Sequence, residues 1–291
     1  MLTILHISDL HFGPPFLPVV GESLLRSAVR LSPDVIVASG DFTQRAKVAQ
    51  FADARAYLDR LPRVPLVVVP GNHDVPLYRA FERVFSPHGN YRRTISSELD
   101  TVLVLPDAVI VALDTTAPLL KITNGRIRRR QIDFCEQAFR QAPPDAARIV
   151  VAHHHFAPAP DYDNEDDVMS GARRALDAFV EMEVDLILGG HLHRTYIGNS
   201  LDVYPSTNRA SGIIIAQCGT TTSRRGRARE REKNSFILSR IENKTIEITQ
   251  YMYFHELDEF APFSRHLFPR RRYHWLIDPA GADSLARGQA Q

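Results

Sequence analysis

TILHISDLH (residues 3–11), VIVASGD (residues 35–41) and LVVVPGNHD (residues 66–74) form the pattern that decides the fold. In each stretch a short run of mostly apolar residues is followed by one or two small or turn-forming residues and then by Asp, Asn or His. Short apolar runs bounded by turn residues are typical of buried strands. The sequence therefore predicts strands whose carboxyl ends carry polar, metal-compatible side chains.

The alternation of strands and helices along the chain determines the fold class. Similar apolar runs predict further strands at 109–113, 149–152 and 186–188. Between the strands, apolar residues recur every three or four positions, which predicts amphipathic helices at 21–31, 46–61, 77–85, 127–141 and 172–181. Buried strands that alternate with helices predict an α/β sheet. Beyond residue 190, extended runs at 213–216, 235–240 and 245–251 have no helix between them, which predicts a second, more antiparallel sheet.

Length and composition indicate one large domain. With 291 residues, of which 44% are hydrophobic, the chain can bury a sizeable core. We expect a catalytic domain over residues 1–251 and an appended aromatic and basic tail over residues 252–291. The 35 Lys+Arg nearly balance the 34 Asp+Glu, so the net charge of +1 does not by itself indicate nucleic acid or anionic lipid as a partner.

The cysteines and the short apolar runs bear on the compartment. Cys135 and Cys218 lie far apart without neighbouring cysteines, so they predict neither a disulfide framework nor a zinc-ligand pair. A reducing cytosol fits this usage. The first residues show no export signal, and the apolar runs are far shorter than the roughly 20 residues that span a bilayer. We therefore expect a cytoplasmic protein without a transmembrane segment.

Metal-compatible side chains follow five of the predicted strands. In an open α/β sheet, ligands bind at the carboxyl ends of the strands, so these side chains are expected to meet at one edge. A mixture of carboxylate, imidazole and amide ligands without thiolates favours Mn²⁺, Fe²⁺, Co²⁺ or Zn²⁺ over Ca²⁺. The residues concerned are Asp9, His11, Asp41, Asn72, His73, His153, His154, His155, His191 and His193.

Taken together, these blocks resemble the calcineurin-like metallophosphoesterase superfamily. They are Asp9-x-His11, Gly40-Asp41, Gly71-Asn72-His73-Asp74, His153-His154 and Gly190-His191-x-His193, in the order found in that family and over roughly residues 3–195. The resemblance implies a four-layer αββα sandwich of two mixed β-sheets flanked by helices. It also implies two divalent metal ions, Mn²⁺, Fe²⁺/Fe³⁺, Zn²⁺ or Co²⁺, bridged by one carboxylate.

The resemblance also implies a role for each matching residue. Asp9, His11 and His193 would bind the first metal. Asp41 would bridge to a second metal, which Asn72, His153 and His191 would hold. At the fourth block the family commonly has two histidines followed by prolines, whereas this chain has three histidines in succession. His154 therefore remains the alternative to His153, and His155 would lie outside the ligand set.

Catalytic and substrate-binding roles are expected for residues that the metals do not use. His73 would stabilise the developing phosphorane charge or protonate the leaving oxygen, and Asp74 would fix the tautomer of His73. Arg79 and Tyr91 follow this block and are candidates for binding phosphate and base, respectively. The competing interpretation of their segment is a helix packed on the sheet with surface arginines.

The likeness is closest to the class III cyclic-nucleotide phosphodiesterase group. It implies hydrolysis of phosphodiesters, with cyclic AMP as leading candidate, by attack of a metal-bridging hydroxide. One alternative is a UDP-diacylglucosamine-type pyrophosphohydrolase, whose acyl slot Phe260, Phe263, Leu267 and Phe268 would line. A DNA nuclease is disfavoured because no long heptad segment is present. A non-enzymatic scaffold is disfavoured because every expected ligand type is present.

Charged segments outside these blocks leave the partners open. The acidic run 161–167 and the basic run 224–233 are each better explained as solvated loops than as a metal site or a phosphate-backbone site. The aromatic and basic run 270–275 suits a subunit interface, a nucleotide or an anionic lipid surface. The expected partner is a small phosphate ester, with a homodimer or a peripheral membrane contact as further options and nucleic acid disfavoured.

Overall fold

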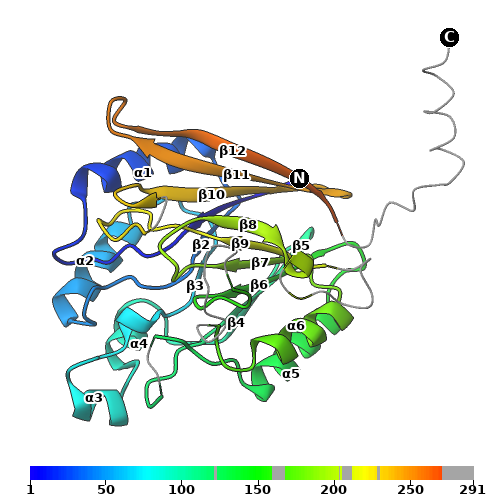
Figure 1. Ribbon diagram of the computed structural model, residues 1–291, viewed down its shortest axis with the longest axis horizontal. Coiled ribbons are helices and arrows are strands. Elements are labelled where there is room, and N and C mark those ends of the chain that lie inside the picture. The colour runs from blue at the N-terminus through cyan, green and yellow to red at the C-terminus, as the bar shows by residue number, and fades with distance from the viewer. Residues whose placement is uncertain (121–122, 159–167, 203, 205–211, 228–229, 271–291) are drawn as a thin grey trace, which may run out of the picture.

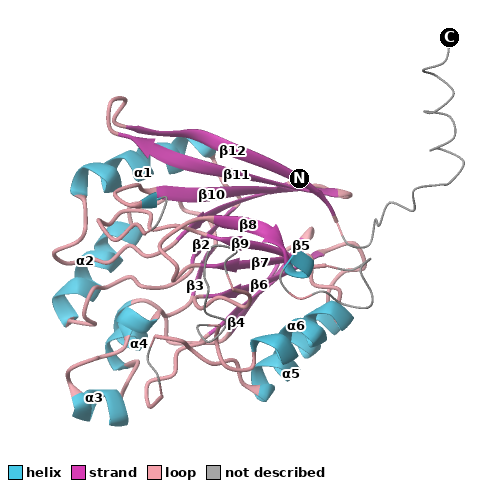
Figure 2. Ribbon diagram, viewed as in Figure 1, coloured by secondary structure: helices cyan, strands magenta, loops and turns pink. Residues whose placement is uncertain are grey.

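Two six-stranded β-sheets lie face to face, with helices on their outer faces (Figures 1 and 2). The computed structural model describes residues 1–291 apart from 121–122, 159–167, 203, 205–211, 228–229 and 271–291. The expected αββα sandwich of mixed sheets is confirmed.

The first sheet joins the start of the chain to its later part. Its order is β12-β11-β10-β1-β2-β3. The neighbours β1, β2 and β3 are parallel, whereas β10 pairs antiparallel with β1 and continues into the antiparallel strands β11 and β12. The bounds are β1 Leu2–Ile7, β2 Val35–Ala38, β3 Leu66–Val68, β10 Ser235–Ile241, β11 Thr245–Phe254 and β12 Glu259–Pro269.

The second sheet has the order β4-β5-β6-β7-β9-β8. Its central strands β5, β6, β7 and β9 are parallel, and β4 and β8 close its edges antiparallel. The bounds are β4 Thr101–Val104, β5 Ala108–Leu113, β6 Ala147–Ala152, β7 Leu186–Gly189, β8 Tyr196–Asn199 and β9 Ile214–Gln217. The predicted division of the sheets at residue 190 is wrong, because β9 extends this sheet whereas β10 and β11 extend the first.

Alternation along the strands explains the layers. In β1, Ile4 contributes to the core between the sheets, and Leu5 and Ile7 contribute to the core beneath the helices. The same alternation in β2 places Val35 and Val37 between the sheets. Successive side chains of a strand point to opposite faces, so a strand covered on both sides is apolar throughout. This is why β1 and β2 consist mostly of apolar residues.

Four helices cover the outer faces. The first sheet carries α1 (Pro18–Leu31) and α2 (Val48–Leu58), and the second carries α5 (Arg129–Arg140) and α6 (Ala172–Glu181). Proline at the first position of α1 suits a helix start, since its missing N–H has no intrahelical acceptor there. Two short helices, α3 (Ala80–Phe85) and α4 (Gly89–Thr94), connect β3 to β4.

The first part of the expected tail belongs to the first sheet. The boundary at residue 251 falls inside β11, and β12 pairs with β11 along almost its whole length. Arg270, just after β12, is buried and pairs with Asp185 at 3.5 Å. The first sheet therefore continues beyond the predicted boundary to Pro269, and residues 271–291 lie outside the described residues. Within the described chain, none of the helices is both long and apolar enough to span a bilayer.

Candidate metal centre

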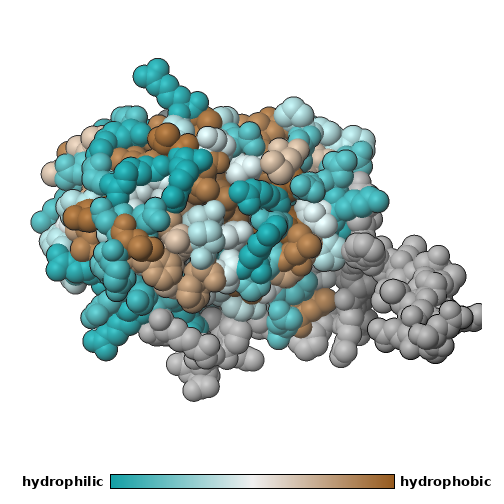
Figure 3. All heavy atoms as spheres, turned by 90° about the horizontal axis from the view of Figure 1, so that it is seen from above, coloured by the Kyte–Doolittle hydropathy of each residue, from teal (hydrophilic) through white to brown (hydrophobic). Residues whose placement is uncertain are grey.

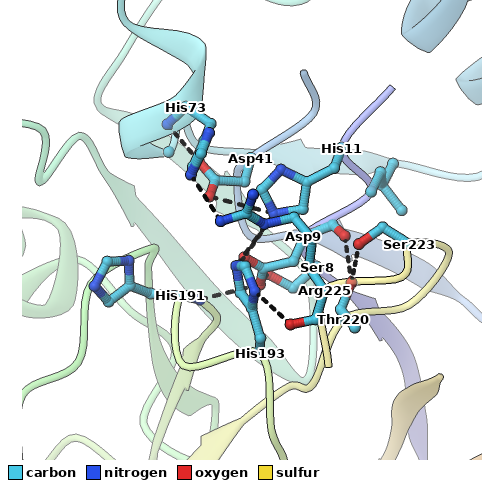
Figure 4. Close-up of polar contacts among 12 residues, drawn as sticks. Ser8, Asp9, His11, Asp41, His73, His191, His193, Thr220, Ser223 and Arg225 are labelled. Carbon is cyan, nitrogen blue, oxygen red and sulfur yellow. Dashed lines mark hydrogen bonds and ion pairs between the residues drawn. The ribbon is translucent and has the colours of Figure 1, made fainter. Parts of the chain in front are cut away.

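The polar residues that follow the strands meet at one edge of the sandwich (Figure 4). The loop after β1 supplies Asp9 and His11, the loop after β2 supplies Asp41, and the loop after β7 supplies His191 and His193. All five residues have positive φ, between 50° and 74°. Non-glycine residues rarely adopt this left-handed conformation, although Asp and His tolerate it better than bulkier types. The backbone at this edge is therefore shaped to aim side chains inward.

One group of ligand atoms forms around Asp9. Its Oδ1 lies 3.1 Å from Nε2 of His193 and 3.7 Å from Nε2 of His11. The Nε2 atoms of His11 and His193 are 3.1 Å apart. Oδ2 of Asp41 lies 3.7 Å from Nε2 of His11. Four buried donor atoms thus surround one point, an arrangement that fits a single cation with nitrogen and oxygen ligands.

A second group lies on the other side of Asp41. Its Oδ2 is 3.5 Å from Nε2 of His153. The amide oxygen of Asn72 lies 3.2 Å from the same nitrogen and 3.0 Å from Nδ1 of His191. The remaining oxygen of Asp41, Oδ1, accepts a hydrogen bond of 2.7 Å from the backbone N–H of His73. Asp41 therefore lies between the two groups, as a bridging carboxylate would.

The carboxylates test whether metal ions fit these groups. Oδ1 of Asp9 and Oδ2 of Asp41 are buried and have no hydrogen-bond partner. A buried carboxylate oxygen without a partner is costly, and a cation is one of the few groups that offset the cost. Each unpartnered oxygen is the one that faces the imidazole nitrogens. The donor set therefore fits two cations.

Outer hydrogen bonds hold the ligands in place. Nδ1–H of His153 donates to the carbonyl of Ser39 at 2.7 Å, and Nδ1–H of His193 donates to that of Arg225 at 2.9 Å. Each bond places the ring proton on Nδ1 and leaves the Nε2 lone pair facing the centre. Oδ2 of Asp9 accepts from the backbone N–H of His191 at 3.0 Å. The tautomers are therefore those that bind metal.

The electrostatics of the site favour charged carboxylates and, mostly, neutral imidazoles. Burial by itself would raise the pKa of Asp9 and Asp41, but the neighbouring imidazoles, His193 and His153 respectively, hold each pKa well below its usual range. Burial lowers the pKa of His11 to about 4. For His153, the opposing charge of Asp41 outweighs burial and raises the pKa to about 9. Its proton would be displaced by a cation at the same place, since metal binding releases ligand protons.

His73 lies beside the metal groups and not in them. Its Nδ1–H donates to the carbonyl of Gln44 at 2.9 Å, and its Nε2 faces the cavity, 3.4 Å from Nη2 of Arg225. Asp74 points elsewhere, because its carboxylate accepts hydrogen bonds from the backbone N–H groups of Phe42, Thr43 and Gly71. The expectation that Asp74 fixes the tautomer of His73 is therefore wrong, since Gln44 does so.

Two predicted substrate residues do not reach the cavity. Arg79 donates to the carbonyl of Ala46 at 2.8 Å and pairs with Glu82 at 2.9 Å. Tyr91 is fully buried, with its ring centroid 6.1 Å from that of Phe42. Their predicted roles are therefore not supported by their positions, and the competing interpretation of a packed segment describes them better.

His154 lies next to the second group, with one ligand atom within 4.8 Å of those of His153 and His191. Its Nδ1 is 2.8 Å from Oγ1 of Thr115, and burial lowers its pKa well below the usual range. Its Nε2 is buried without a partner. Because His153, and not His154, faces both Asp41 and Asn72, the geometry favours His153 as the ligand.

Two glycines are required where the ligand loops approach one another. A Cβ on Gly71 would lie 2.2 Å from Oδ1 of Asp41, and a Cβ on Gly190 would lie 1.9 Å from Oγ of Ser8 and 2.7 Å from Oδ2 of Asp9. All three distances are too short for a Cβ atom to be accommodated without a shift of its neighbours. The glycines of the sequence blocks therefore allow the loops to pack closely around the centre.

A cavity of about 310 Å³ opens over the centre. It includes two arginines, Arg225 and Arg227, from the basic run that we expected to be a solvated loop. The basic composition of the run could be seen in the sequence. Its place at the cavity could not be predicted, because the run is far in sequence from the ligand blocks. The lining residues are Asp41, Gln44, Arg45, Asn72, His73, Val75, Leu77, Thr123, Asn124, His155, Pro158, His191, Leu192, His193, Arg225 and Arg227.

The apolar residues expected to line an acyl slot lie elsewhere. Phe260 is fully buried in the core beneath the helices, while Phe263 and Leu267 are exposed on β12. On the face seen in Figure 3, hydrophobic residues are scattered among hydrophilic ones. None of the predicted acyl-slot residues lines the cavity, so the structure offers no support for a diacylated substrate.

Comparisons with known proteins agree with this geometry. The family model described as calcineurin-like phosphoesterase matches residues 2–195. A probable cyclic nucleotide phosphodiesterase of Rhodopseudomonas palustris is 27% identical over 66% of this chain and 72% of its own. A second, from Synechococcus, is 27% identical over 67% of this chain and 75% of its own. Among solved structures, a purple acid phosphatase from yellow lupin superposes with a TM-score of 0.68 at 13% identity; the match covers 92% of this chain and 54% of that protein.

Proposed function

Because the chain belongs to the calcineurin-like phosphoesterase family and is a metal-dependent phosphoester hydrolase, we propose that it hydrolyses phosphodiesters at a dinuclear centre. Cyclic AMP is the leading candidate substrate. The observation that carries this proposal is the position of Asp41 between two sets of ligand atoms.

The proposed ligand sets follow from the distances. Asp9, His11 and His193 would hold one cation, and Asn72, His153 and His191 the other, with Asp41 shared. The ligand types suit Mn²⁺, iron, Co²⁺ or Zn²⁺. Two such cations would supply an activated water and positive charge for the phosphoryl oxygens.

The chain's own residues supply the remaining functions. Asn72 contributes a neutral oxygen, so it adds no negative charge that would repel an anionic substrate. His73 presents Nε2 to the cavity while its Nδ1–H donates to the carbonyl of Gln44. In the imidazolium form, the Nε2–H is positioned to pass its proton to the leaving oxygen, which leaves the ring neutral. The loops of Gly71 and Gly190 keep these groups in place before substrate arrives.

The preference for a cyclic nucleotide rests on the named relatives and on the cavity. Both curated relatives carry the name of probable cyclic nucleotide phosphodiesterases. The cavity combines polar groups with the apolar side chains of Val75 and Leu77, as sites for small organic ligands do. Metal ions select phosphates in general, and the lining selects the leaving group.

A substrate panel tests the proposal. The purified protein, loaded with Mn²⁺, would be assayed on cyclic AMP, bis(p-nitrophenyl) phosphate, p-nitrophenyl phosphate and a nucleoside diphosphate sugar. We expect higher kcat/KM for the diesters than for the monoester or the pyrophosphate. Asn72→Ala should abolish turnover, whereas Asp53→Asn, an exposed change on α2, should retain it. A higher kcat/KM for the monoester or the pyrophosphate would contradict the proposal.

A further inference from the structure

Three arginines gather at the mouth of the cavity. Arg45 comes from the loop after β2, and Arg225 and Arg227 come from the loop after β9. In the part of the chain that the structure describes, no carboxylate lies within ion-pairing distance of any of the three guanidinium groups. Several arginines elsewhere on this protein do have such a partner, such as Arg129 with Asp133 and Arg60 with Glu22.

The contacts that these arginines make leave their donors largely available. Nη1 of Arg225 lies 3.3 Å from Oε1 of Gln44, Nη2 lies 3.4 Å from Nε2 of His73, and Nε is buried without a partner. Arg45 rests over the ring of Tyr78 at 4.9 Å. Long contacts to neutral acceptors use little of the binding capacity of a guanidinium group, which prefers two parallel bonds to an oxyanion.

The positive charges of these three arginines indicate an anionic ligand. Burial lowers the pKa of Arg225, the Arg227 and Arg45 charges act in the same direction, and Asp41 opposes them. Like charges that face one opening repel one another unless an anion lies between them. Arg225 borders the candidate metal centre and can bind an oxygen of the scissile phosphate. Arg45 and Arg227 then exceed what a diester with a single negative charge requires.

We infer that Arg45 and Arg227 form a subsite for a second phosphate group, carried by the substrate in addition to the scissile diester. This inference rests on the proposed phosphodiesterase function and narrows the class of substrate. The subsite predicts that a diester with a further phosphate is hydrolysed with a higher kcat/KM than the same diester without it. Arg225 serves both kinds of diester, because it contacts the phosphate that all of them share.

A matched pair of dinucleotides tests the subsite. ApA and its 5′-phosphorylated form pApA have the same scissile bond and differ by one phosphate. With the Mn²⁺-loaded protein we expect kcat/KM for pApA to exceed that for ApA by about tenfold or more, the usual effect of hydrogen bonds to a charged group. The ratio should fall to near one in the double variant Arg45→Gln, Arg227→Gln.

Controls separate the subsite from general charge effects. Arg129→Gln removes the same charge from an exposed position on α5 and should leave the ratio unchanged. Arg225→Gln should lower kcat/KM for both dinucleotides by similar factors. A wild-type ratio near one, or a ratio that the double variant retains, would overturn the inference.

Binding without turnover provides an independent readout. In calorimetry on metal-free protein, ADP should bind more tightly than AMP, and the double variant should lose the difference while its circular dichroism spectrum stays unchanged. If ADP shows this preference but neither the dinucleotides nor cyclic AMP nor bis(p-nitrophenyl) phosphate is cleaved, the subsite stands and the proposed function fails. If both dinucleotides are cleaved equally and both nucleotides bind equally, the proposed function stands and the subsite is rejected.

Discussion

Asp41→Asn is expected to separate metal binding from folding. The substitution keeps the shape of the side chain, and the amide oxygen can still accept the hydrogen bond from the backbone N–H of His73. It removes the negative charge that both ligand groups share. The new amide N–H₂ would face Nε2 of His11 and of His153, which lie 3.7 Å and 3.5 Å from the carboxylate oxygen it replaces.

The expected effect on the metal-free protein is small. Above pH 8, His153 can release its proton once the carboxylate that raises its pKa to about 9 is gone. Its free lone pair can then accept from the new amide. One ion pair is thus exchanged for neutral hydrogen bonds, and we expect the free energy of unfolding to change by about 1 kcal/mol or less.

The expected effect on the metal-loaded protein is large. A cation present at 100 times its dissociation constant stabilises the folded state by about 2.7 kcal/mol, so two cations contribute about 5 kcal/mol. At roughly 2–4 °C per kcal/mol, this corresponds to a rise in Tm of roughly 10–20 °C on addition of metal. Asp41→Asn should lose most of that rise.

Differential scanning calorimetry with and without Mn²⁺ measures both quantities, and metal analysis after dialysis counts the bound ions. Asp53→Asn is the matched control, since it makes the same chemical change at an exposed position. If Asp41→Asn showed the same metal-dependent rise in Tm as the wild type, Asp41 would not be a shared ligand. If it unfolded well below the wild type without metal, Asp41 would instead have a structural role.

Three further variants test other parts of the reasoning. Gly190→Ala places a Cβ 1.9 Å from Oγ of Ser8 and 2.7 Å from Oδ2 of Asp9, so metal affinity measured by titration should fall by about tenfold or more; unchanged affinity would show that the loop can shift freely. Tyr91→Phe removes a buried hydroxyl without a hydrogen-bond partner, so kcat/KM should stay the same and stability in urea should be equal or higher; a loss of activity would restore the predicted substrate role. Burial lowers the pKa of His6 to about 3, so the unfolded chain takes up a proton below about pH 6.5 that the folded protein refuses, and His6 should contribute about 2 kcal/mol to the fall in stability in urea from pH 7 to pH 5. His6→Gln should remove that contribution. If the wild type and the variant lost stability equally between pH 7 and pH 5, the lowered pKa of His6 would be refuted.

The sequence predicted the features that short segments encode by themselves. The strands and the ligand blocks at their ends, such as Asp9 with His11, could be predicted because strand pattern and ligand type are written in neighbouring residues. The edge of the sheet at which they meet followed from the parallel α/β pattern. His153 was preferred to His154 because it directly follows its strand, and the folded chain supports that preference, since the ring of His153 faces Asp41.

What the sequence could not predict depends on contacts between distant segments. Asp74 was predicted to orient His73 because the two are adjacent in sequence. Its carboxylate is instead taken by the backbone N–H groups of Phe42 and Thr43, and the carbonyl of Gln44 orients His73. Tyr91 lies on a helix of six residues, too short for an apolar period to show which face is buried. The place of Arg225 depends on the path of the loop after β9, which no local pattern records.

The backbone hydrogen bonds of the site explain why a ligand side chain can be replaced without loss of the fold. The N–H of Asp9 donates to the carbonyl of Gly40 at 3.1 Å, and the N–H of His11 donates to that of Asp41 at 2.9 Å. The loops after β1 and β2 therefore hold each other by main-chain bonds in their left-handed conformations, which cost of order 1–3 kcal/mol for each strained residue. These bonds do not involve the ligand side chains, so they persist when a carboxylate becomes an amide. A site built in this way presents its donors in fixed positions before any cation binds, and for this reason the loss of metal in Asp41→Asn should not be accompanied by loss of the fold.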